Sequence, residues 1–319
     1  MIDRRHLCFA TETDHDASWP MWHTSAWLTV PDGPCDELHV LVHGAGLDHR
    51  YWDWPVESDR YSYVSWAADR RIATLNVDRV GCGFSSRPPG REVSVVAQAH
   101  ALARVVDSVR NSSDSTIPRF ARVVIVGHSL GSVICGTAAA TAGVADAVVL
   151  SGYLPVDGTT EMGEDLFDFA FTSALEGMPH LVGLLDADYL VARDGLGVDE
   201  LRYWKPGADL EIMAFDNLTK SPATKTELGD AALAGPLIRT ISTPTLGIVG
   251  QHDALMIDAA LGDADAHGTV LRVADGVGSN FAFMVVPDAG HMLNLHRNAH
   301  QTFAAIDQWL STHCRSTTR

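Results

Sequence analysis

The chain has 319 residues, of which 46% are hydrophobic and 20% are charged. This composition is typical of a globular protein with a large core and excludes a disordered or fibrous chain. The 40 acidic and 23 basic residues leave a formal charge of −17, which would repel nucleic acid and anionic lipid surfaces. We therefore expect neither nucleic acid nor a membrane as a partner.

Residues 1–20 contain no apolar run as long as the core of a signal peptide, and nowhere do about 18 uncharged apolar residues follow one another. The five Cys residues are scattered and lack the spacings of zinc sites. We therefore expect a cytoplasmic protein with reduced thiols and no bound metal. The sequence leaves open whether the chain forms a homodimer.

Short apolar runs rich in β-branched residues predict strands along most of the chain. The runs cover residues 26–30, 38–42, 72–77, 122–126, 147–150, 245–249 and 281–286. Several are apolar on both faces, as central strands of a parallel sheet covered by helices are. The first one or two alternate more, which predicts an antiparallel edge.

Helical periods occur between these runs. Apolar residues at steps of three and four predict helices around residues 95–109 and 299–310. Strands that alternate with helices indicate a doubly wound α/β sheet, mostly parallel.

The alternation stops between residues 153 and 236, where helical fragments are interrupted by Gly, Pro and acidic residues. We interpret residues 153–236 as a helical lid inserted into a core of residues 1–152 and 237–319. The insertion carries 16 acidic and 5 basic residues, most of which we assign to a solvated outer face. Such an acidic lid would disfavour polyanionic substrates.

The sequence Gly127-His128-Ser129-Leu130-Gly131 directly follows the run 122–126 and precedes a plausible helix at 132–141. This G-x-S-x-G pattern between strand and helix predicts a tight turn with Ser129 at its tip, where the flanking glycines avoid clashes with neighbouring backbone. In any other context Ser129 would be read as an ordinary helix cap.

A serine hydroxyl needs a base to become nucleophilic, and the base needs an acid to orient it. Asp253 follows the run 245–249, and His291 follows the run 281–286. Both positions lie just beyond strand ends, where ligands bind in open α/β sheets. The rival histidines are His267, His296 and His300, and the rival acids are Asp258 and Asp288.

With these motifs the chain resembles the α/β-hydrolase superfamily, in which the order along the sequence is Ser, then acid, then His. The resemblance implies Ser129 as nucleophile, Asp253 as orienting acid and His291 as base. His43-Gly44-Ala45-Gly46 is similar to the H-G-x-G loop of the family, which implies an oxyanion hole made of the backbone N–H groups of Ala45 and Leu130. The phosphate-binding patterns G-x-G-x-x-G and G-x-x-x-x-G-K do not occur.

The segment from Asp78 to Ser85 resembles the D-x-x-G-x-G-x-S loop of the superfamily, and we interpret Asp78, Arg79 and Ser85 as structural. Cys82 is interpreted as a small turn residue, with a reactive thiol as the alternative. The resemblance covers residues 25–152 and 237–313. The strongly Arg-rich, Lys-poor composition also resembles that of actinobacterial proteins.

The resemblance implies a cofactor-free serine hydrolase that acts on an ester, thioester or lactone of a mostly apolar small molecule. Ser129 argues against the dehalogenase and epoxide hydrolase branches, which have Asp there. Two alternatives stay open: a lyase of the same fold that eliminates a carboxylate such as acetate in natural-product biosynthesis, and a receptor that has lost the chemistry.

The insertion offers apolar side chains for an acyl pocket. These are Leu166, Phe167, Phe169, Phe171, Leu175, Tyr189, Tyr203, Trp204, Met213 and Phe215. The segment Tyr51-Trp52-Asp53-Trp54-Pro55 is a second aromatic candidate for the pocket wall.

Overall fold

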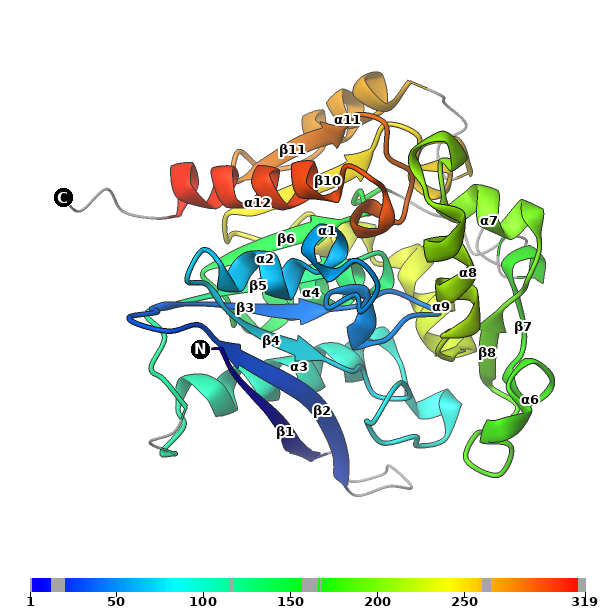
Figure 1. Cartoon of the computed structure of the whole chain (residues 1–319), viewed down its shortest axis with the longest axis horizontal. Helices are drawn as coiled ribbons and strands as arrows, with labels where there is room; N and C mark the ends of the chain where they lie inside the picture. Colours follow the sequence, from blue (N-terminus) through cyan, green and yellow to red (C-terminus); the bar gives the residue numbers. More distant parts are fainter. Residues whose placement is uncertain are drawn as a thin grey trace.

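The computed structural model describes residues 2–12, 21–114, 117–156, 166, 168–259 and 265–314. Eight strands form one sheet in the order β1-β2-β4-β3-β5-β6-β10-β11 (Figure 1). Their bounds are β1 (Asp3–Glu12), β2 (Met21–Val30), β3 (Glu37–Val42), β4 (Ala73–Val77), β5 (Arg122–His128), β6 (Ala147–Ser151), β10 (Thr245–Gly250) and β11 (Phe281–Val286). All seven predicted strands lie in this sheet, which confirms the doubly wound, mostly parallel architecture.

The antiparallel edge differs in detail from the prediction. β1 pairs antiparallel with β2, and β2 pairs antiparallel with β4. β3, the second predicted strand, is instead a central strand that pairs parallel with β4 and β5. The sequence did not predict β1, because its polar residues give it no continuous apolar run.

Helices cover both faces of the sheet. α3 (Val95–Arg110), α4 (Leu130–Ala142) and α10 (Gly235–Ile238) contribute to the apolar cluster on one face. α1 (Ser58–Tyr61), α2 (Tyr63–Ala68) and α12 (Ala299–His313) contribute to the cluster on the other face, and α11 (Ala266–Asp275) packs against β11. Every residue of β3, β4, β6 and β10 is buried, as the two-sided apolar runs predict.

Short helical turns complete the core and its loops. The 3₁₀ turns are η1 (His49–Tyr51), η2 (Gly90–Glu92), η3 (Pro179–Leu181), η4 (Lys205–Gly207) and η6 (Leu293–Leu295), and η5 (Ala254–Ala259) is a π-helical turn.

The chain between β6 and β10 is not purely helical, in contrast to the expectation. It contains α6 (Ala174–Gly177), α7 (Leu196–Arg202), α8 (Leu210–Leu218) and α9 (Lys225–Leu233). It also forms a small antiparallel sheet of β7 (Phe171–Ser173), β8 (Tyr189–Ala192) and β9 (Ala223–Thr224). These strands have two to four residues, which is too short for an alternating pattern to be recognised.

This segment lies at the end of the molecule toward which the arrowheads of β3 and β4 point (Figure 1). We keep the term insertion for residues 153–236, whose two boundaries stay a prediction. Its position places it over the carboxyl ends of the parallel strands, where the candidate residues were predicted to gather.

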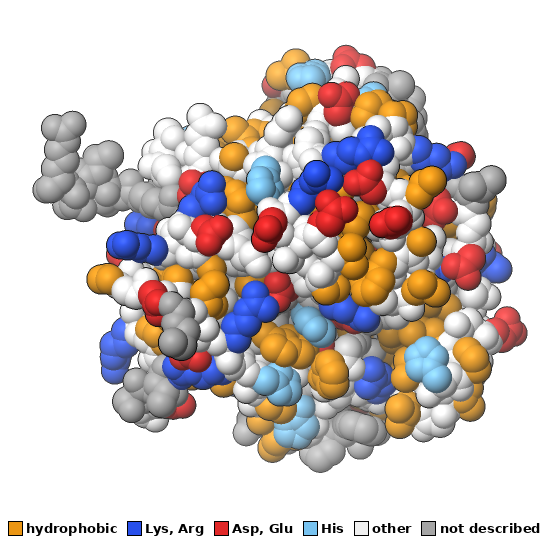
Figure 2. All heavy atoms as spheres, viewed as in Figure 1, with side chains coloured by type: hydrophobic (Ala, Val, Ile, Leu, Met, Phe, Trp, Pro, Cys, Tyr) orange, Lys and Arg blue, Asp and Glu red, His pale blue; other side chains and the backbone are white. Residues whose placement is uncertain are grey.

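Acidic and basic side chains are interspersed on the face shown in Figure 2. Within the part of the chain that the structure describes, no helix combines the length and the apolar character needed to cross a membrane.

Candidate active site

Ser129 occupies a strained turn between β5 and α4. Its φ of 53° and ψ of −121° lie in a region that L-residues rarely adopt. A Cβ on Gly127 would lie 2.4 Å from the carbonyl oxygen of Gly131, and a Cβ on Gly131 would lie 2.2 Å from that of Val42. As predicted, both positions need a glycine: Gly127 lets the turn approach the start of α4, and Gly131 lets α4 pack against the end of β3.

The Ser129 side chain is partly exposed and lines a cavity of about 200 Å³ at the carboxyl end of the sheet. The Ser129 N–H donates to the carbonyl of Ser151 at 2.8 Å, which fixes the turn to the end of β6. Most other residues of the cavity wall are apolar and come from α4, the insertion and the loops after β3, β10 and β11.

His291 and Asp253 form a buried pair beside this cavity. The distances from His291 Nδ1 to the two carboxylate oxygens of Asp253 are 3.1 and 3.0 Å. Both residues are at most 3% exposed. A carboxylate only accepts hydrogen bonds, so Nδ1 donates and Nε2 is left as the acceptor. His291 lines the cavity together with Ser129.

The carboxylate of Asp253 is fixed from its own loop. Its Oδ1 accepts the backbone N–H groups of Leu255 and Met256 at 3.1 and 3.0 Å. These bonds fix the orientation of the Asp253 carboxylate toward His291.

Among the described residues, no hydrogen bond joins Ser129 Oγ to His291. In enzymes without substrate such contacts are often long and tighten only in the complex.

The alternative candidates for the base and the acid lie in environments that differ from those of His291 and Asp253. His296 is fully buried, and its Nε2 accepts the N–H groups of Gly290 and Trp204 at 3.0 and 3.1 Å. Burial lowers the pKa of His296 to about 4. His267, His300 and Asp288 are exposed, and the side chain of Asp258 lies outside the described part.

The loop after β3 packs against the turn that contains Ser129. A Cβ on Gly44 would lie 3.0 Å from the Ser129 Cβ. The Gly44 carbonyl accepts hydrogen bonds from His43 Nδ1 at 3.0 Å and from Arg79 Nη2 at 3.2 Å. Because the peptide unit is planar and trans, this fixes the direction of the Ala45 N–H, which points away from the carbonyl. Ala45 itself lines the cavity.

Leu130 is the first residue of α4, so its N–H has no acceptor within the helix. It also lines the cavity with Ala45 and Ser129. The two expected oxyanion donors therefore belong to residues on the wall of the same cavity.

Arg79 connects this loop to the insertion through a buried ion pair. Its Nη1 lies 2.7 Å from Glu227 Oε2, and both side chains are 1% exposed. Glu227 also accepts from Gln98 at 2.9 Å and forms the capping box that begins α9. The Arg79 N–H donates to His43 Nε2 at 3.1 Å, and burial together with Arg79 holds the pKa of His43 well below its ordinary value.

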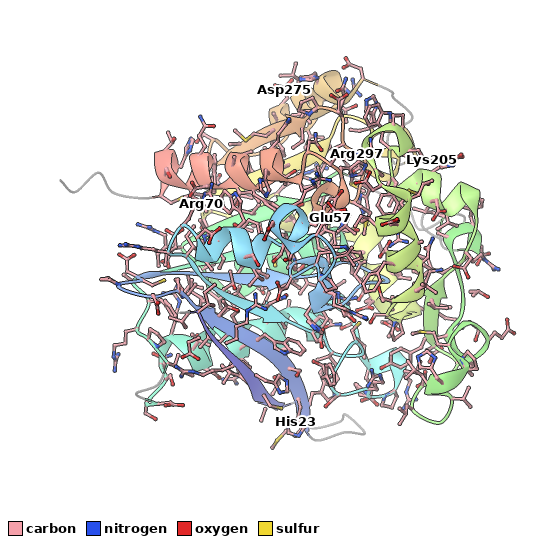
Figure 3. All side chains as sticks on the ribbon, viewed as in Figure 1. His23, Glu57, Arg70, Lys205, Asp275 and Arg297 are labelled. Carbon is pink, nitrogen blue, oxygen red and sulfur yellow. The ribbon has the colours of Figure 1, made fainter. Side chains whose placement is uncertain are left out.

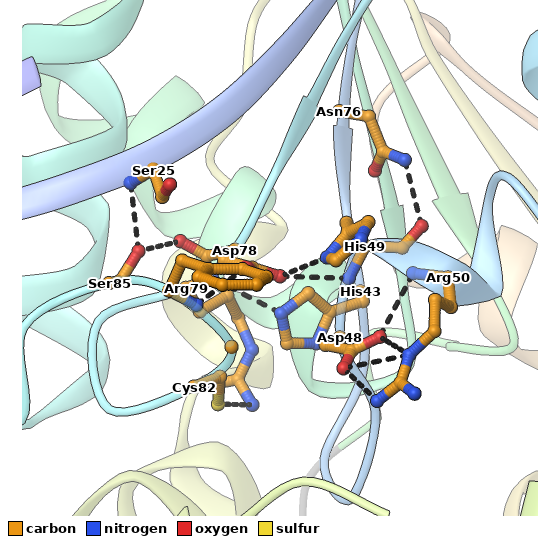
Figure 4. Close-up of polar contacts among 12 residues, drawn as sticks. Ser25, His43, Asp48, His49, Arg50, Asn76, Asp78, Arg79, Cys82 and Ser85 are labelled. Atoms are coloured by element: carbon orange, nitrogen blue, oxygen red, sulfur yellow. Dashed lines mark hydrogen bonds and ion pairs between the residues drawn. The ribbon is translucent and has the colours of Figure 1, made fainter. Parts of the chain in front are cut away.

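Asp78 organises the loop after β4, as predicted (Figure 4). Its Oδ1 accepts the backbone N–H and Nδ1 of His49, each at 2.9 Å, and its Oδ2 accepts the N–H of Phe84 at 2.8 Å. Ser85 Oγ donates to the Asp78 carbonyl at 2.7 Å.

Asp48, His49 and Asp78 offer three possible metal-ligand atoms within 4.8 Å of one another. Asp48 binds the Arg50 guanidinium, with Nε at 2.8 Å from Oδ1. These carboxylates thus have protein partners, and the cluster is explained without a metal ion.

Cys82 is a buried residue of this loop. Its Sγ donates to the Pro222 carbonyl at 3.1 Å, and burial raises its pKa to about 12. Such a thiol is unreactive at neutral pH, which agrees with its interpretation as a turn residue.

The expected pocket wall is confirmed only in part. Leu166 and Phe171 of the insertion line the cavity. Phe169 is 53% exposed, Tyr203 and Met213 are buried in the core, and Phe167 lies outside the described residues.

The segment Tyr51–Pro55 was wrongly predicted as a pocket wall, because Tyr51, Trp52 and Trp54 are buried in the core cluster below α12. They are not among the described residues that line the cavity.

Two polar residues of the cavity wall were not singled out by the sequence. His128 stacks on Tyr51 with ring centroids 4.2 Å apart, and burial, with His291 and Arg202 nearby, holds its pKa well below the ordinary value. Arg202, at the end of α7, also lines the cavity, whereas most charges of the insertion are expected on a solvated outer face. The sequence carries no signal that separates this one charge from the others.

Residues 40–305 match the model of the family described as alpha/beta hydrolase. No curated protein matches the sequence significantly.

Solved structures share the fold at low identity. A soluble variant of monoglyceride lipase from Saccharomyces cerevisiae has 15% identity and a TM-score of 0.63, with 98% of this chain and 96% of that chain covered. A thermostable carboxyl esterase from Bacillus coagulans has 14% identity and a TM-score of 0.63, with 97% and 98% covered. The alpha/beta hydrolase GrgF from Penicillium sp. sh18 has 13% identity and a TM-score of 0.59, with 98% and 99% covered.

Proposed function

We propose that this chain, which belongs to the alpha/beta hydrolase family, is a cofactor-free serine hydrolase that cleaves an ester, thioester or lactone of a mostly apolar small molecule. One observation carries the proposal. Ser129, on its strained turn, and His291, bound to the buried Asp253, line one apolar cavity. A nucleophile, a base and an acid that orients the base are the groups that acyl transfer requires.

In the proposed mechanism, Nε2 of His291 takes the proton of Ser129 Oγ as this oxygen attacks the carbonyl carbon of the substrate. Asp253 stabilises the imidazolium that forms. In this mechanism the N–H groups of Ala45 and Leu130 donate to the oxyanion, and the proposal is supported by the fact that both residues line the cavity with Ser129. His291 then protonates the leaving group as the C–O or C–S bond breaks, which leaves an acyl-Ser129.

Hydrolysis of this intermediate repeats the steps with water. His291 removes a proton from water, the hydroxide adds to the acyl carbon, and Ser129 leaves with the proton returned by His291. The products are a carboxylic acid and the free enzyme.

The cavity supports a substrate of moderate size. Its volume of about 200 Å³ and its largely apolar wall favour a short or medium acyl chain over a polymer. The names of two neighbours, a monoglyceride lipase and a carboxyl esterase, agree with carboxylic ester chemistry on this fold.

The test is turnover of p-nitrophenyl esters of increasing acyl length by the wild type and by Ser129→Ala. We expect the variant to lose at least about 10³-fold in kcat, since the triad acts as a unit. Intact-mass measurement with an alkyl phosphonate should show one adduct on the wild type and none on Ser129→Ala. The matched control is Ser132→Ala, which removes a buried hydroxyl three residues away and should keep the adduct.

Reaction in ¹⁸O-labelled water separates hydrolysis from elimination. Hydrolysis of an acyl-enzyme places one ¹⁸O in the acid product, whereas an eliminated carboxylate carries none. Near-normal turnover by Ser129→Ala, or an unlabelled acid product, would refute the proposal.

A further inference from the structure

We infer that Arg202 binds a carboxylate of the substrate, so that the enzyme acts on acidic esters. This inference rests on the proposed function and narrows its substrate class. Arg202 is the one residue with a permanent charge among the described residues that line the cavity. A buried cation on a largely apolar wall costs desolvation energy, which its ion pair with Asp216 offsets in part and a bound anion would offset further.

The position of Arg202 is fixed relative to the candidate base. Arg202 is 8% exposed at the end of α7. Its carbonyl accepts the N–H of Met292 at 2.9 Å, the residue that follows His291. The backbone of Arg202 is therefore hydrogen-bonded to the loop that contains His291. This connection would keep the position of a substrate bound by Arg202 constant relative to His291.

Asp216 binds one side of the Arg202 guanidinium. Its Nη2 lies 2.5 Å from Asp216 Oδ2, which also accepts the Tyr203 hydroxyl at 2.7 Å. The Nη1 contact with Asn217 is long, at 3.4 Å. Asp216 is 2% exposed and is not among the described residues of the cavity wall.

Arg202 is thus paired with Asp216 and contributes to the cavity wall, to which Asp216 does not belong. A guanidinium has five N–H donors in a rigid fork, and these contacts leave donors for a ligand. A carboxylate is the planar acceptor that such a fork matches.

The charge of the surrounding segment works against an anionic ligand. Residues 153–236 carry 16 acidic and 5 basic residues. Their field opposes the entry of anions, so an acidic substrate needs a cation inside the cavity to be held there.

The experiment compares pairs of esters that differ in one terminal group, carboxylate against methyl, at equal chain length. One series places this group on the acyl chain of p-nitrophenyl esters, and the other places it on the alcohol of butyrate esters. We expect the wild type to prefer the carboxylate in at least one series, with a kcat/KM ratio of about 10 to 100.

Variants test whether Arg202 causes the preference for the carboxylate ester. Arg202→Gln/Asp216→Asn removes both charges of the pair and avoids an unpaired buried Asp216, and it should abolish the preference. Arg202→Lys keeps a charge but not the fork, and should retain part of it. The matched control is Arg193→Gln, which removes an exposed Arg outside the cavity wall and should leave the ratio unchanged.

Calorimetric titration of Ser129→Ala with the same esters measures binding without turnover. A tighter Kd for the carboxylate member supports the role of Arg202 even if the wild type hydrolyses no ester, in which case the proposed function alone fails. A wild type that turns over neutral esters, with no carboxylate preference in kcat/KM or Kd in either series, overturns the inference and leaves the proposed function standing.

Discussion

Substitution of Glu227 by Gln tests the buried connection between the core and the insertion. Glu227 is bound to Arg79 at 2.7 Å, and neither side chain is more than 1% exposed. The substitution keeps the shape of the side chain but leaves the Arg79 charge buried without its counter-ion. Breaking one partner of a buried ion pair costs about 3 to 5 kcal/mol.

This loss is a large share of the total stability, since domains unfold with about 5 to 15 kcal/mol. The substitution should also affect the candidate active site, because Arg79 Nη2 donates to the Gly44 carbonyl and thereby fixes the direction of the Ala45 N–H. We expect kcat to fall as well, by no more than the roughly 10²- to 10³-fold that loss of one oxyanion donor costs.

The assay is urea unfolding at pH 7 followed by circular dichroism, with ester turnover measured in parallel. Glu200→Gln is the matched control, because Glu200 binds Lys205 at a similar 2.8 Å but is 64% exposed. We expect the control to change the free energy of unfolding by at most about 1 kcal/mol. In Arg79→Met/Glu227→Gln the loss should be smaller than the sum of the two single losses. A loss below about 1 kcal/mol for Glu227→Gln would refute this reasoning.

Gly131→Ala should destabilise the fold by about 1 to 3 kcal/mol or more and reduce turnover, because its Cβ would meet the backbone carbonyl of Val42 at 2.2 Å. Gly229→Ala is its control: it meets nothing within 4 Å in α9 and should stabilise by about 0.5 to 1 kcal/mol, as urea midpoints will show. The pKa of His296 is about 4 in the folded chain, against an ordinary value of 6.5 that we take for the unfolded chain. Between these values the unfolded chain binds the proton more readily, so the free energy of unfolding falls as pH drops from about 6.5 to 4. His296→Gln should flatten this fall by up to roughly 3 kcal/mol in urea titrations at pH 7 and 4.5; equal slopes in both proteins would contradict the assignment.

The central sheet was predictable because its strands are buried on both faces, so each appears as a continuous apolar run in the sequence. β5 is an example, with six of its seven positions buried. Strand ends then located the candidate residues, since the carboxyl ends of parallel strands meet at one edge. Ser129, Asp253 and His291 were found in this way, and their catalytic roles stay proposals.

Other features depend on contacts between distant parts of the chain. β1 is recognised only from its pairing with β2, because its own residues do not form an apolar run. The burial of Arg202 depends on Asp216 in the next helix and on Met292, 90 residues further along the chain. Within a strongly acidic segment, the neighbouring residues give no signal that distinguishes a buried charged side chain from a solvent-exposed one.

Several contacts attach the insertion to the loops around the cavity. Arg297 lies next to the insertion, close to Lys205 (Figure 3). It donates to the Pro206 and Ala208 carbonyls at 2.8 and 2.9 Å and to Asp209 at 2.6 Å. Further contacts join Trp204 to His296, Arg202 to Met292, Ser221 to Gly46 and Glu227 to Arg79.

A swing of the whole insertion away from the sheet would have to break these contacts together. At about 1 kcal/mol for each hydrogen bond, this amounts to about 6 kcal/mol or more. An opened state of that free energy is populated by roughly one molecule in 10⁴ or fewer. We therefore expect the insertion to stay in place when a small molecule binds, so that the cavity of about 200 Å³ beside Ser129 limits the size of what can bind there.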